Sequence, residues 1–187
     1  MNLKYIDYFD SEHKNEIKKV YMNSFPKAER FPFWILKRCS KEKNVLFNVI
    51  LDGDKLIGME YIINCENYAY LMYLAVDKNQ RENAYGSKIL EDLTKRYETI
   101  ILSIERPNKD SNDNSKKRKK FYLKNGFYET NKFIEDNEVQ YEILCTNKDY
   151  TITKEKLEER YTKMTDSTLM KWIISKLFNV YDICFIK

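Results

Sequence analysis

A polar loop between an apolar strand and a helix is the segment of this sequence best suited to chemistry. The apolar run ends at Val76, and residues 81–86 (RENAYG) lead into an amphipathic stretch that begins at Ser87. Such a loop exposes consecutive backbone N–H groups at the positive end of a helix dipole. The small residues Ala84 and Gly86 allow a ligand to approach the backbone closely. The pattern suits a pyrophosphate, but taken alone it is a weak signal, because small residues before helices are common and the Rossmann fingerprint and the P-loop pattern are both absent.

The elements around this loop predict a mixed sheet. Before the loop, we expect a short strand, two helices and three strands, and an Asp-Gly-Asp turn at residues 52–54 joins the first two of these three strands into a hairpin. After the loop, we expect a helix, an almost wholly apolar and therefore central strand, a polar loop over 108–114, a basic helix that ends at Gly126, and two further strands. This order predicts an α/β (α+β) fold with about seven strands and helices on both faces.

The segment from Thr151 onward changes to charged and then apolar helical character. We therefore predict one domain over residues 1–148 and a C-terminal helical extension over residues 149–187. The extension is expected to pack on the core or on a second subunit.

Composition and charge narrow the class of protein. The 187 residues include 33 basic and 29 acidic side chains, and this small positive excess suits an anionic ligand without requiring nucleic acid. Four scattered cysteines without a C-x-x-C pair favour reduced thiols and a cytoplasmic protein. We expect no membrane span, because Lys171, Lys176 and Asp182 interrupt the apolar C-terminal stretch. A single histidine, His13, argues against a metal site that needs two, and we predict no metal.

Two motifs resemble the markers of the GNAT (GCN5-related N-acetyltransferase) superfamily. Residues 81–86 are similar to its acyl-coenzyme A loop, [QR]-x-x-G-x-[GA], and Val76 and Asp77 precede the loop at the family's spacing. Residues 121–127 (FYLKNGF) look like its second marker, a helix that ends in F/L-Y-x-x-x-G-F. The resemblance covers roughly residues 2–145, and it implies a splayed, GNAT-like sheet.

The resemblance also implies a cofactor, acetyl-CoA. Backbone amides of the loop would bind its pyrophosphate, and the edge of the preceding strand would pair with its pantetheine arm. The residues implied in cofactor binding are Leu74, Ala75, Val76, Arg81, Glu82, Asn83, Ala84, Tyr85, Gly86, Ser87, Asn114, Ser115 and Tyr122. Two positions depart from the family pattern: Ala84 replaces the first loop glycine, and Ser115 stands where many relatives carry asparagine.

Three residues are our candidates for catalysis. Tyr122 occupies the position that the family places near the cofactor sulfur, and a phenol can donate a proton to the departing thiolate. Glu105 and Glu60 are candidates for the base that deprotonates the amine, and Glu29 is a further one. Each glutamate has an alternative role as a structural ion-pair partner.

Residues 23–36 combine two prolines with several aromatic residues, and we expect them to form the wall of the acceptor site. The candidates for substrate binding are Glu29, Phe31, Phe33 and Tyr73, with a simple core role as the alternative for the phenylalanines. The basic run at residues 116–120 either lies on a solvated helix face or contacts the 3′-phosphate of coenzyme A. We expect no nucleic-acid partner, since no zinc spacing or RNA-binding motif accompanies the run.

The function that these observations favour is transfer of an acetyl group from acetyl-CoA to a primary amine of a small molecule, by direct attack on the thioester. The alternatives are a protein or peptide N-acetyltransferase and a non-catalytic module that binds acyl-CoA. The identity of the amine, the acyl chain length and a homodimer are left open by the sequence.

Overall fold

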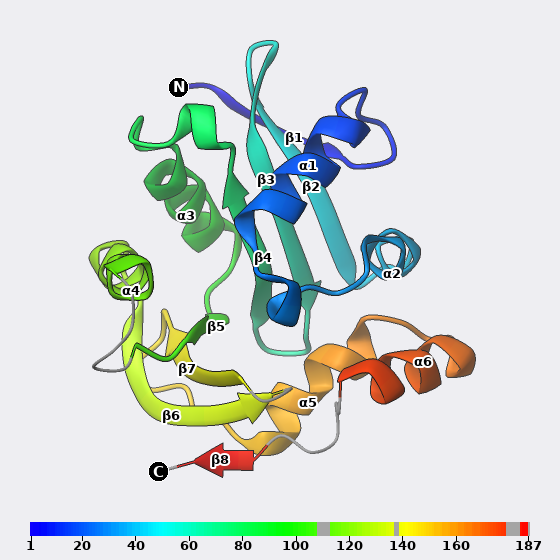
Figure 1. The fold of residues 1–187 in the computed structure, drawn as a ribbon. Helices are drawn as coiled ribbons and strands as arrows, with labels where there is room; N and C mark the ends of the chain where they lie inside the picture. Colours follow the sequence, from blue (N-terminus) through cyan, green and yellow to red (C-terminus); the bar gives the residue numbers. More distant parts are fainter. Residues whose placement is uncertain (108–112, 137–138, 179–183, 187) are drawn as a thin grey trace.

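The computed structural model describes residues 1–107, 113–136, 139–178 and 184–186. Within these residues the strands form one sheet of eight, in the order β1-β2-β3-β4-β5-β7-β6-β8 (Figure 1). The predicted mixed α/β class is confirmed. The additional strand, β8, lies in the segment that we expected to be helical. The expected polar loop at 108–114 falls mostly outside the described residues.

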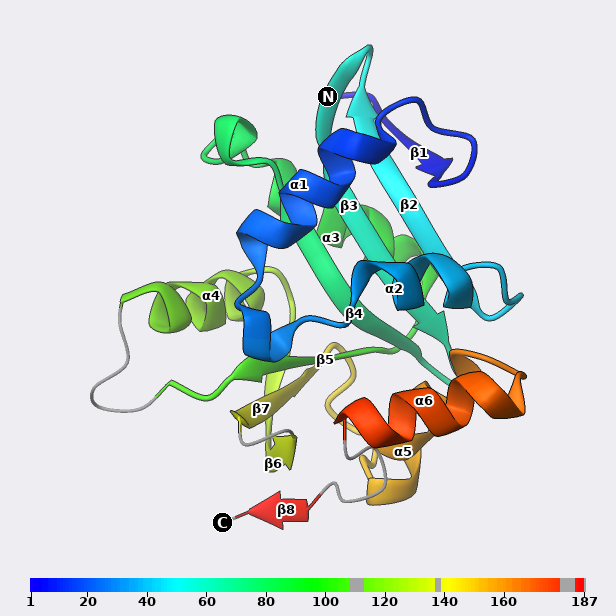
Figure 2. The same cartoon turned by 45° about the vertical axis from the view of Figure 1, so that its right-hand side comes forward.

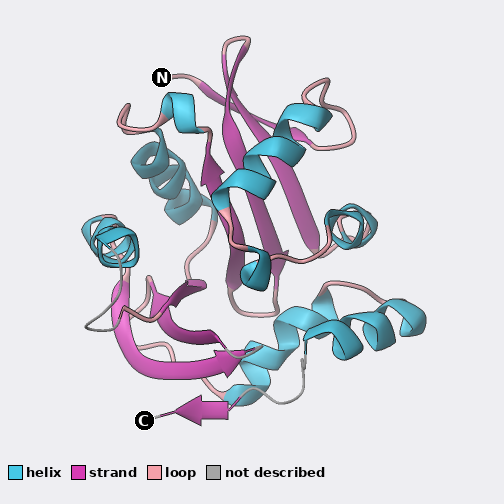
Figure 3. Cartoon of the chain, viewed as in Figure 1, coloured by secondary structure: helices cyan, strands magenta, loops and turns pink. Residues whose placement is uncertain are grey.

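The elements alternate along the chain largely as the sequence pattern indicates (Figure 3). The strands are β1 (Leu3–Asp7), β2 (Val45–Asp52), β3 (Lys55–Asn64), β4 (Ala69–Val76), β5 (Ile100–Glu105), β6 (Tyr128–Asp136), β7 (Val139–Cys145) and β8 (Cys184–Ile186). The α-helices are α1 (Lys14–Ser24), α2 (Phe33–Cys39), α3 (Tyr85–Arg96), α4 (Asp113–Lys124), α5 (Lys154–Lys163) and α6 (Thr168–Phe178). Two short 3₁₀ turns are η1 (Lys27–Glu29) and η2 (Lys78–Gln80).

Helices cover both faces of the sheet. Figure 2 shows α1 and α2 in front of β2, β3 and β4, with α3 behind them. The core is divided accordingly: one cluster contains residues of α1, α2, α5 and α6, and the other contains residues of α3. Side chains of β4 alternate between the two, since Tyr73 and Ala75 belong to the first cluster, whereas Leu74 and Val76 pack against the second. This alternation decides which side chains from β4 reach each face of the sheet.

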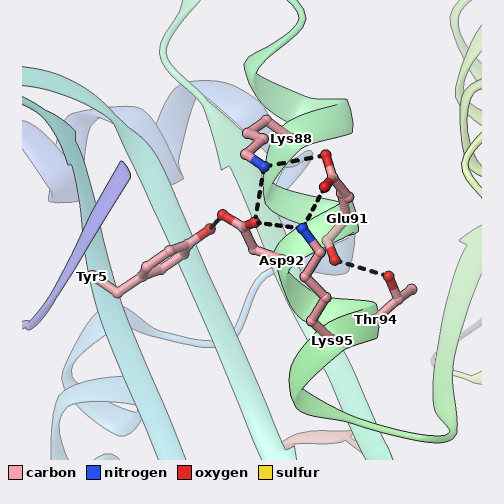
Figure 4. A network of polar contacts seen from close by, with 6 residues as sticks. All are labelled: Tyr5, Lys88, Glu91, Asp92, Thr94 and Lys95. Atoms are coloured by element: carbon pink, nitrogen blue, oxygen red, sulfur yellow. Dashed lines mark hydrogen bonds and ion pairs between the residues drawn. The ribbon is translucent and has the colours of Figure 1, made fainter. Parts of the chain in front are cut away.

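Polar contacts fix α3 against the first strand (Figure 4). The Tyr5 hydroxyl donates to Asp92 Oδ2 at 3.0 Å, which joins β1 to the middle of α3. Along the helix, Lys88 and Lys95 form ion pairs with Glu91 and Asp92. Exposed pairs of this kind contribute little individually. The Tyr5–Asp92 contact is therefore the one in this group that joins α3 to the sheet.

The C-terminal segment packs against the rest of the chain. Leu157, Tyr161, Met164, Met170 and Ile174 are buried in the same cluster as α1 and α2. Beyond α6, β8 pairs antiparallel with β6. The boundary at residues 148 and 149, and a contact with a second subunit, stay predictions. Every helix in the described part of the chain is too short or too polar to cross a lipid bilayer.

Candidate active site

A cavity of about 1080 Å³ lies where β4 and β5 separate. Besides residues of β4, β5 and β7, its wall includes the loop that enters α3, one face of α4, the segment from the end of α1 through η1, and part of α5. It therefore receives side chains from both faces of the sheet. A cavity of this size accommodates a large ligand together with a small one.

The separation of β4 from β5 leaves a free strand edge. β4 pairs with β3 along its length as far as Val76, but it pairs with β5 only at Ala69–Ile100 and Tyr70–Ile101. Over residues 71–76, no described strand occupies the β5 side of β4. A shift in register after Tyr61 also leaves Met72 as an extra residue in β4, and such a bulge increases the local twist. The edge is therefore available to an extended ligand, as the expected splay requires.

The loop that enters α3 has the backbone of an anion site. Asp77 caps η2 by accepting from the Asn79 N–H at 2.8 Å, and the chain then passes through Glu82 at φ +71° and Ala84 at φ +58°. Ala84 is the N-cap of α3, and its side chain cannot satisfy the first N–H groups of that helix, which leaves them available for an anion. Gly86 lies in the first turn, where an added Cβ would come within 2.9 Å of the Phe121 ring.

The structure brings most of the expected cofactor residues together around the cavity. Its wall includes Leu74, Ala75, Val76, Arg81, Glu82, Ala84, Tyr85, Gly86, Ser87, Asn114, Ser115 and Tyr122. Asn83 is exposed and lies outside this wall. Asn114 and Ser115 are in the first turn of α4, so a second helix N-terminus points to the same cavity.

Tyr122 lies in the cavity wall on the face of α3 and α4. Its ring meets Phe121 and Phe127 edge-on, at centroid distances of 5.2 and 5.4 Å. Burial raises the pKa of Tyr122 to about 12, and the nearby Arg118 offsets this only in part. The phenol is therefore protonated at neutral pH, as a proton donor must be.

Two carboxylates occupy the opposite face of the cavity. Glu105 is the last residue of β5, and its side chain is on the same face of the strand as that of Ile101, which belongs to the first core cluster. Glu29 is the last residue of η1. The Glu29 side chain is 12% exposed, and Arg118 Nη1 lies 3.8 Å from its carboxylate. Burial raises the pKa of Glu29 above its ordinary value of 4.5; Arg118 lowers it and Glu105 raises it further. Glu29 is therefore a stronger base than an exposed glutamate.

Hydrogen bonds of Tyr73 and Phe31 hold η1, the 3₁₀ turn that contains Glu29, in position. The Tyr73 hydroxyl donates to the Glu29 carbonyl at 2.9 Å and accepts from the Phe31 N–H at 3.1 Å. The Tyr21 hydroxyl donates to the Phe31 carbonyl at 2.9 Å. Tyr73 and Phe31 line the cavity as expected, and these contacts give both residues a part in holding η1 over β4.

Besides Asn83, two more of the expected site residues are not brought to the cavity. Glu60 is fully buried on the α3 face, where its carboxylate accepts from Arg96 at 2.8 and 2.9 Å and from Asn48 at 2.9 Å. A carboxylate engaged in this way is a structural ion-pair partner, so these contacts favour the structural role of Glu60 over that of a catalytic base. Phe33 packs in the aromatic core against Tyr8, Tyr21 and Phe47.

The basic run of α4 is divided between structural and cavity roles. Lys119 pairs with Glu142, which is buried, and with Glu129. Lys117 and Arg118 line the cavity instead. Contact of this run with a phosphate of coenzyme A stays a prediction.

Sequence reasoning missed a group of residues at the closed end of the gap. Arg160 and Tyr161 from α5, Tyr70 from β4 and Ser103 from β5 all line the cavity. A signal for α5 was present, because Leu157, Arg160 and Tyr161 are spaced i, i+3 and i+4 and therefore share one helical face.

One family model matches part of the chain. Residues 43–129 match the family model described as an acetyltransferase (GNAT) domain. No curated protein matches the chain in sequence. Among solved structures, a Bacteroides thetaiotaomicron protein assigned to the GNAT family is 20% identical, with a TM-score of 0.67 over 95% of this chain and 97% of its own.

Two further structures share the fold. An aminoglycoside 6′-N-acetyltransferase complexed with coenzyme A is 14% identical, with a TM-score of 0.62 over 82% of this chain and all of its own. The ribosomal-protein-S18-alanine N-acetyltransferase from Escherichia coli is 15% identical, with a TM-score of 0.59 over 81% of this chain and 99% of its own. Residues 43–129 are therefore similar to a GNAT acetyltransferase domain, and the solved structures share their fold with most of the chain.

Proposed function

We propose that the protein is an N-acetyltransferase that moves an acetyl group from acetyl-CoA to a primary amine of a small molecule, by direct attack of the amine on the thioester. The observation that carries the proposal is the gap between β4 and β5. Tyr122 reaches the gap from one face of the sheet, whereas Glu29 and Glu105 reach it from the other, and all three line one cavity.

The residues around the gap fit acetyl-CoA, which when bound supplies the activated acetyl group. Backbone N–H groups at the start of α3 bind phosphate oxygens, and the free edge of β4 orients an extended arm. A backbone N–H near Leu74 would donate a hydrogen bond to the thioester carbonyl oxygen as negative charge develops there, an effect of about 3–4 kcal/mol.

Glu29 and Glu105 bind the amine and remove its proton. An alkylammonium has a pKa of about 10.4, so only a small fraction is neutral at pH 7. Glu29 is the most suitable proton acceptor, because burial raises the pKa of its carboxyl group toward neutral pH. Glu105, which is exposed and interacts electrostatically with Glu29, binds the incoming ammonium. On the other face, Tyr122 Oη holds the proton for the leaving group.

Direct attack is favoured over an acyl-cysteine intermediate. Among the described residues that line the cavity, none is cysteine. Burial raises the pKa of Cys39 and of Cys65 to about 12, so neither thiol is an effective nucleophile at neutral pH.

The test is release of free thiol from acetyl-CoA with panels of small amines and of peptides, for the wild-type protein and for Tyr122→Phe. We expect turnover with small amines, and a decrease of about 10²- to 10⁴-fold in kcat in the variant, because a general acid is lost. Coenzyme A affinity measured by calorimetry should change little. Tyr128→Phe, an exposed tyrosine of β6 outside this cavity, is the matched control.

Three results would contradict the proposal. Turnover with peptides alone would favour the protein acetyltransferase alternative. Binding of acetyl-CoA without turnover in either panel would favour a non-catalytic module. Full activity of Tyr122→Phe would remove Tyr122 from the mechanism.

A further inference from the structure

Arg118 connects the two faces of the sheet across the gap between β4 and β5. It belongs to α4, on the face of Tyr122, and its Nη1 atom lies 3.8 Å from the carboxylate of Glu29, which comes from η1 on the opposite face. Among the described residues, this contact is the one ion pair of Arg118. The distance is too long for a hydrogen bond, so Arg118 acts on Glu29 through its charge.

Arg118 also lies one helical turn before Tyr122. Residues four positions apart in a helix share a face, and both side chains line the same cavity. Burial is the larger influence on the pKa of Tyr122 and of Glu29 and raises both, whereas the charge of Arg118 lowers both. One cation therefore stabilises the ionised forms of the proposed acid and of the proposed base.

The other charged groups near Glu29 act differently. Besides Arg118 and Glu29, the described charged residues that line the cavity are Arg81, Glu82, Glu105, Lys117, Lys124 and Arg160. Of these, Glu105 acts on Glu29, and it raises the Glu29 pKa. Arg30, the next residue in the chain, donates to a backbone carbonyl of α1 at 2.7 Å. The Tyr73 hydroxyl donates to the backbone carbonyl of Glu29 rather than to its carboxylate.

The movement of protons during the transfer changes which group carries negative charge beside Arg118. Ionised Glu29 takes one proton from the ammonium, becomes neutral and later releases this proton to water. Negative charge then develops on the sulfur, as the carbon–nitrogen bond forms and the carbon–sulfur bond breaks. Tyr122 donates its proton to that sulfur and receives the second proton that the nitrogen loses. Arg118 therefore has an anionic neighbour throughout, first on the side of Glu29 and then on the side of Tyr122.

We propose that Arg118 is a positioning residue that couples the two proton transfers: it holds the Glu29 carboxylate at the gap, and it stabilises negative charge beside Tyr122 once Glu29 is neutral. This inference rests on the proposed function, because it concerns the acid and the base of the same transfer. It gives one member of the basic run on α4 a role other than binding a phosphate.

The first experiment needs neither cofactor nor substrate. In protein labelled with ¹³C at the glutamate side-chain carboxyl, the Glu29 signal is assigned by its absence in Glu29→Gln and is followed against pH. Arg118→Met should raise the pKa of Glu29 by about 1 unit, the lower end of the effect of an opposite charge at this distance, because Arg118 is 33% exposed. Arg118→Lys should prevent most of this rise, since charge and not hydrogen-bond geometry is what acts. Arg38→Met, which removes an exposed ion pair with Glu42 outside the cavity, should leave the Glu29 titration unchanged.

The second experiment measures turnover of acetyl-CoA with the small amine that reacts fastest with the wild-type protein. In Arg118→Met, the acidic limb of the profile of kcat/KM against pH should move upward by the same amount as the Glu29 titration. Its kcat should fall roughly 10-fold, less than for loss of a donor that contacts the reacting atoms directly. Arg118→Lys should retain most of the activity, and coenzyme A affinity should change little in both variants.

The outcomes separate the two proposals. If the Glu29 carboxyl titrates alike in the wild-type protein and in Arg118→Met, the inference is overturned and the proposed function stands. If the titration moves but the acidic limb of the activity profile does not, Arg118 does not act through Glu29 and the inference is overturned as well. A large loss of coenzyme A affinity in Arg118→Met, with an unchanged Glu29 titration, would assign Arg118 to the cofactor instead. If acetyl-CoA binds to the wild-type protein but no amine is acetylated, the proposed function fails and the inference falls with it.

Discussion

Replacing Ala84 by glycine should stabilise the protein, because the loop holds this alanine in a left-handed conformation. Ala84 has φ +58° and ψ +8°, and its side chain provides no cap for α3. The left-handed region costs an L-residue roughly 1–2 kcal/mol, and glycine avoids this cost. The greater freedom of glycine in the unfolded chain offsets part of the gain. We expect a net increase of about 1 kcal/mol in the free energy of unfolding, and a rise of about 2–4 °C in Tm.

Two control variants separate this effect from others. Gly53 has φ +62° with no atom within 4 Å of an added Cβ, so Gly53→Ala should lose about as much as Ala84→Gly gains. Ala28 is exposed in η1 and has no positive φ, so Ala28→Gly should lose about 0.5–1 kcal/mol.

Urea denaturation of the three variants measures these changes, and calorimetry with coenzyme A shows whether the relaxed loop binds more tightly. Destabilisation by Ala84→Gly, alongside destabilisation by Gly53→Ala, would refute the reasoning from backbone conformation.

Two further predictions concern buried carboxylates. Arg96→Met should lower the free energy of unfolding by about 3 kcal/mol, because it leaves the Glu60 charge buried without its ion-pair partner. Lys95→Met removes an exposed ion pair and serves as the control, so it should change the free energy of unfolding by less than about 1 kcal/mol. Similar losses in the two variants would contradict the structural role of Glu60. Glu29→Gln should change the pH dependence of stability. Since burial raises the Glu29 pKa, the folded state binds this proton more tightly than the unfolded state, and the resulting stability is present below pH 4.5 and is lost as the pH rises through the raised pKa. Relative to the variant, the wild-type protein should therefore lose stability as the pH rises above 4.5 and through the raised pKa, and a difference in urea midpoints that does not change with pH would contradict the assignment.

The parts of the fold that depend on local signals were predictable from the sequence. The loop at residues 81–86, the hairpin turn at Gly53 and the helix that precedes Gly126 each have a distinctive pattern of glycines, caps and apolar residues. These features also fix the position of Tyr122 relative to the loop. Most of the candidate cofactor site therefore follows from two short motifs.

The parts that depend on sheet face and on distant partners were not predictable. β3 is buried on both faces, so its sequence shows no alternation that would assign Glu60 to one side. The partner of Glu60, Arg96, lies 36 residues away on α3. Arg160 belongs to a helix whose many charges suggest a solvated surface, and only its spacing from Leu157 and Tyr161 indicates a buried position. The strand β8 has three residues, too few for a periodic pattern.

The contact between Gly86 and Phe121 links the loop that we propose binds phosphate to the proposed general acid, Tyr122. Gly86 belongs to the first turn of α3, and the Phe121 ring occupies the space that a side chain at position 86 would need. Phe121 in turn packs edge-on against Tyr122. The absence of a side chain at position 86 therefore sets the spacing between two helices, in addition to admitting a phosphate group. As a result, any side chain at position 86 would push the Phe121 ring toward the Tyr122 phenol, so the volume of a single loop position sets the alignment of the proposed proton donor.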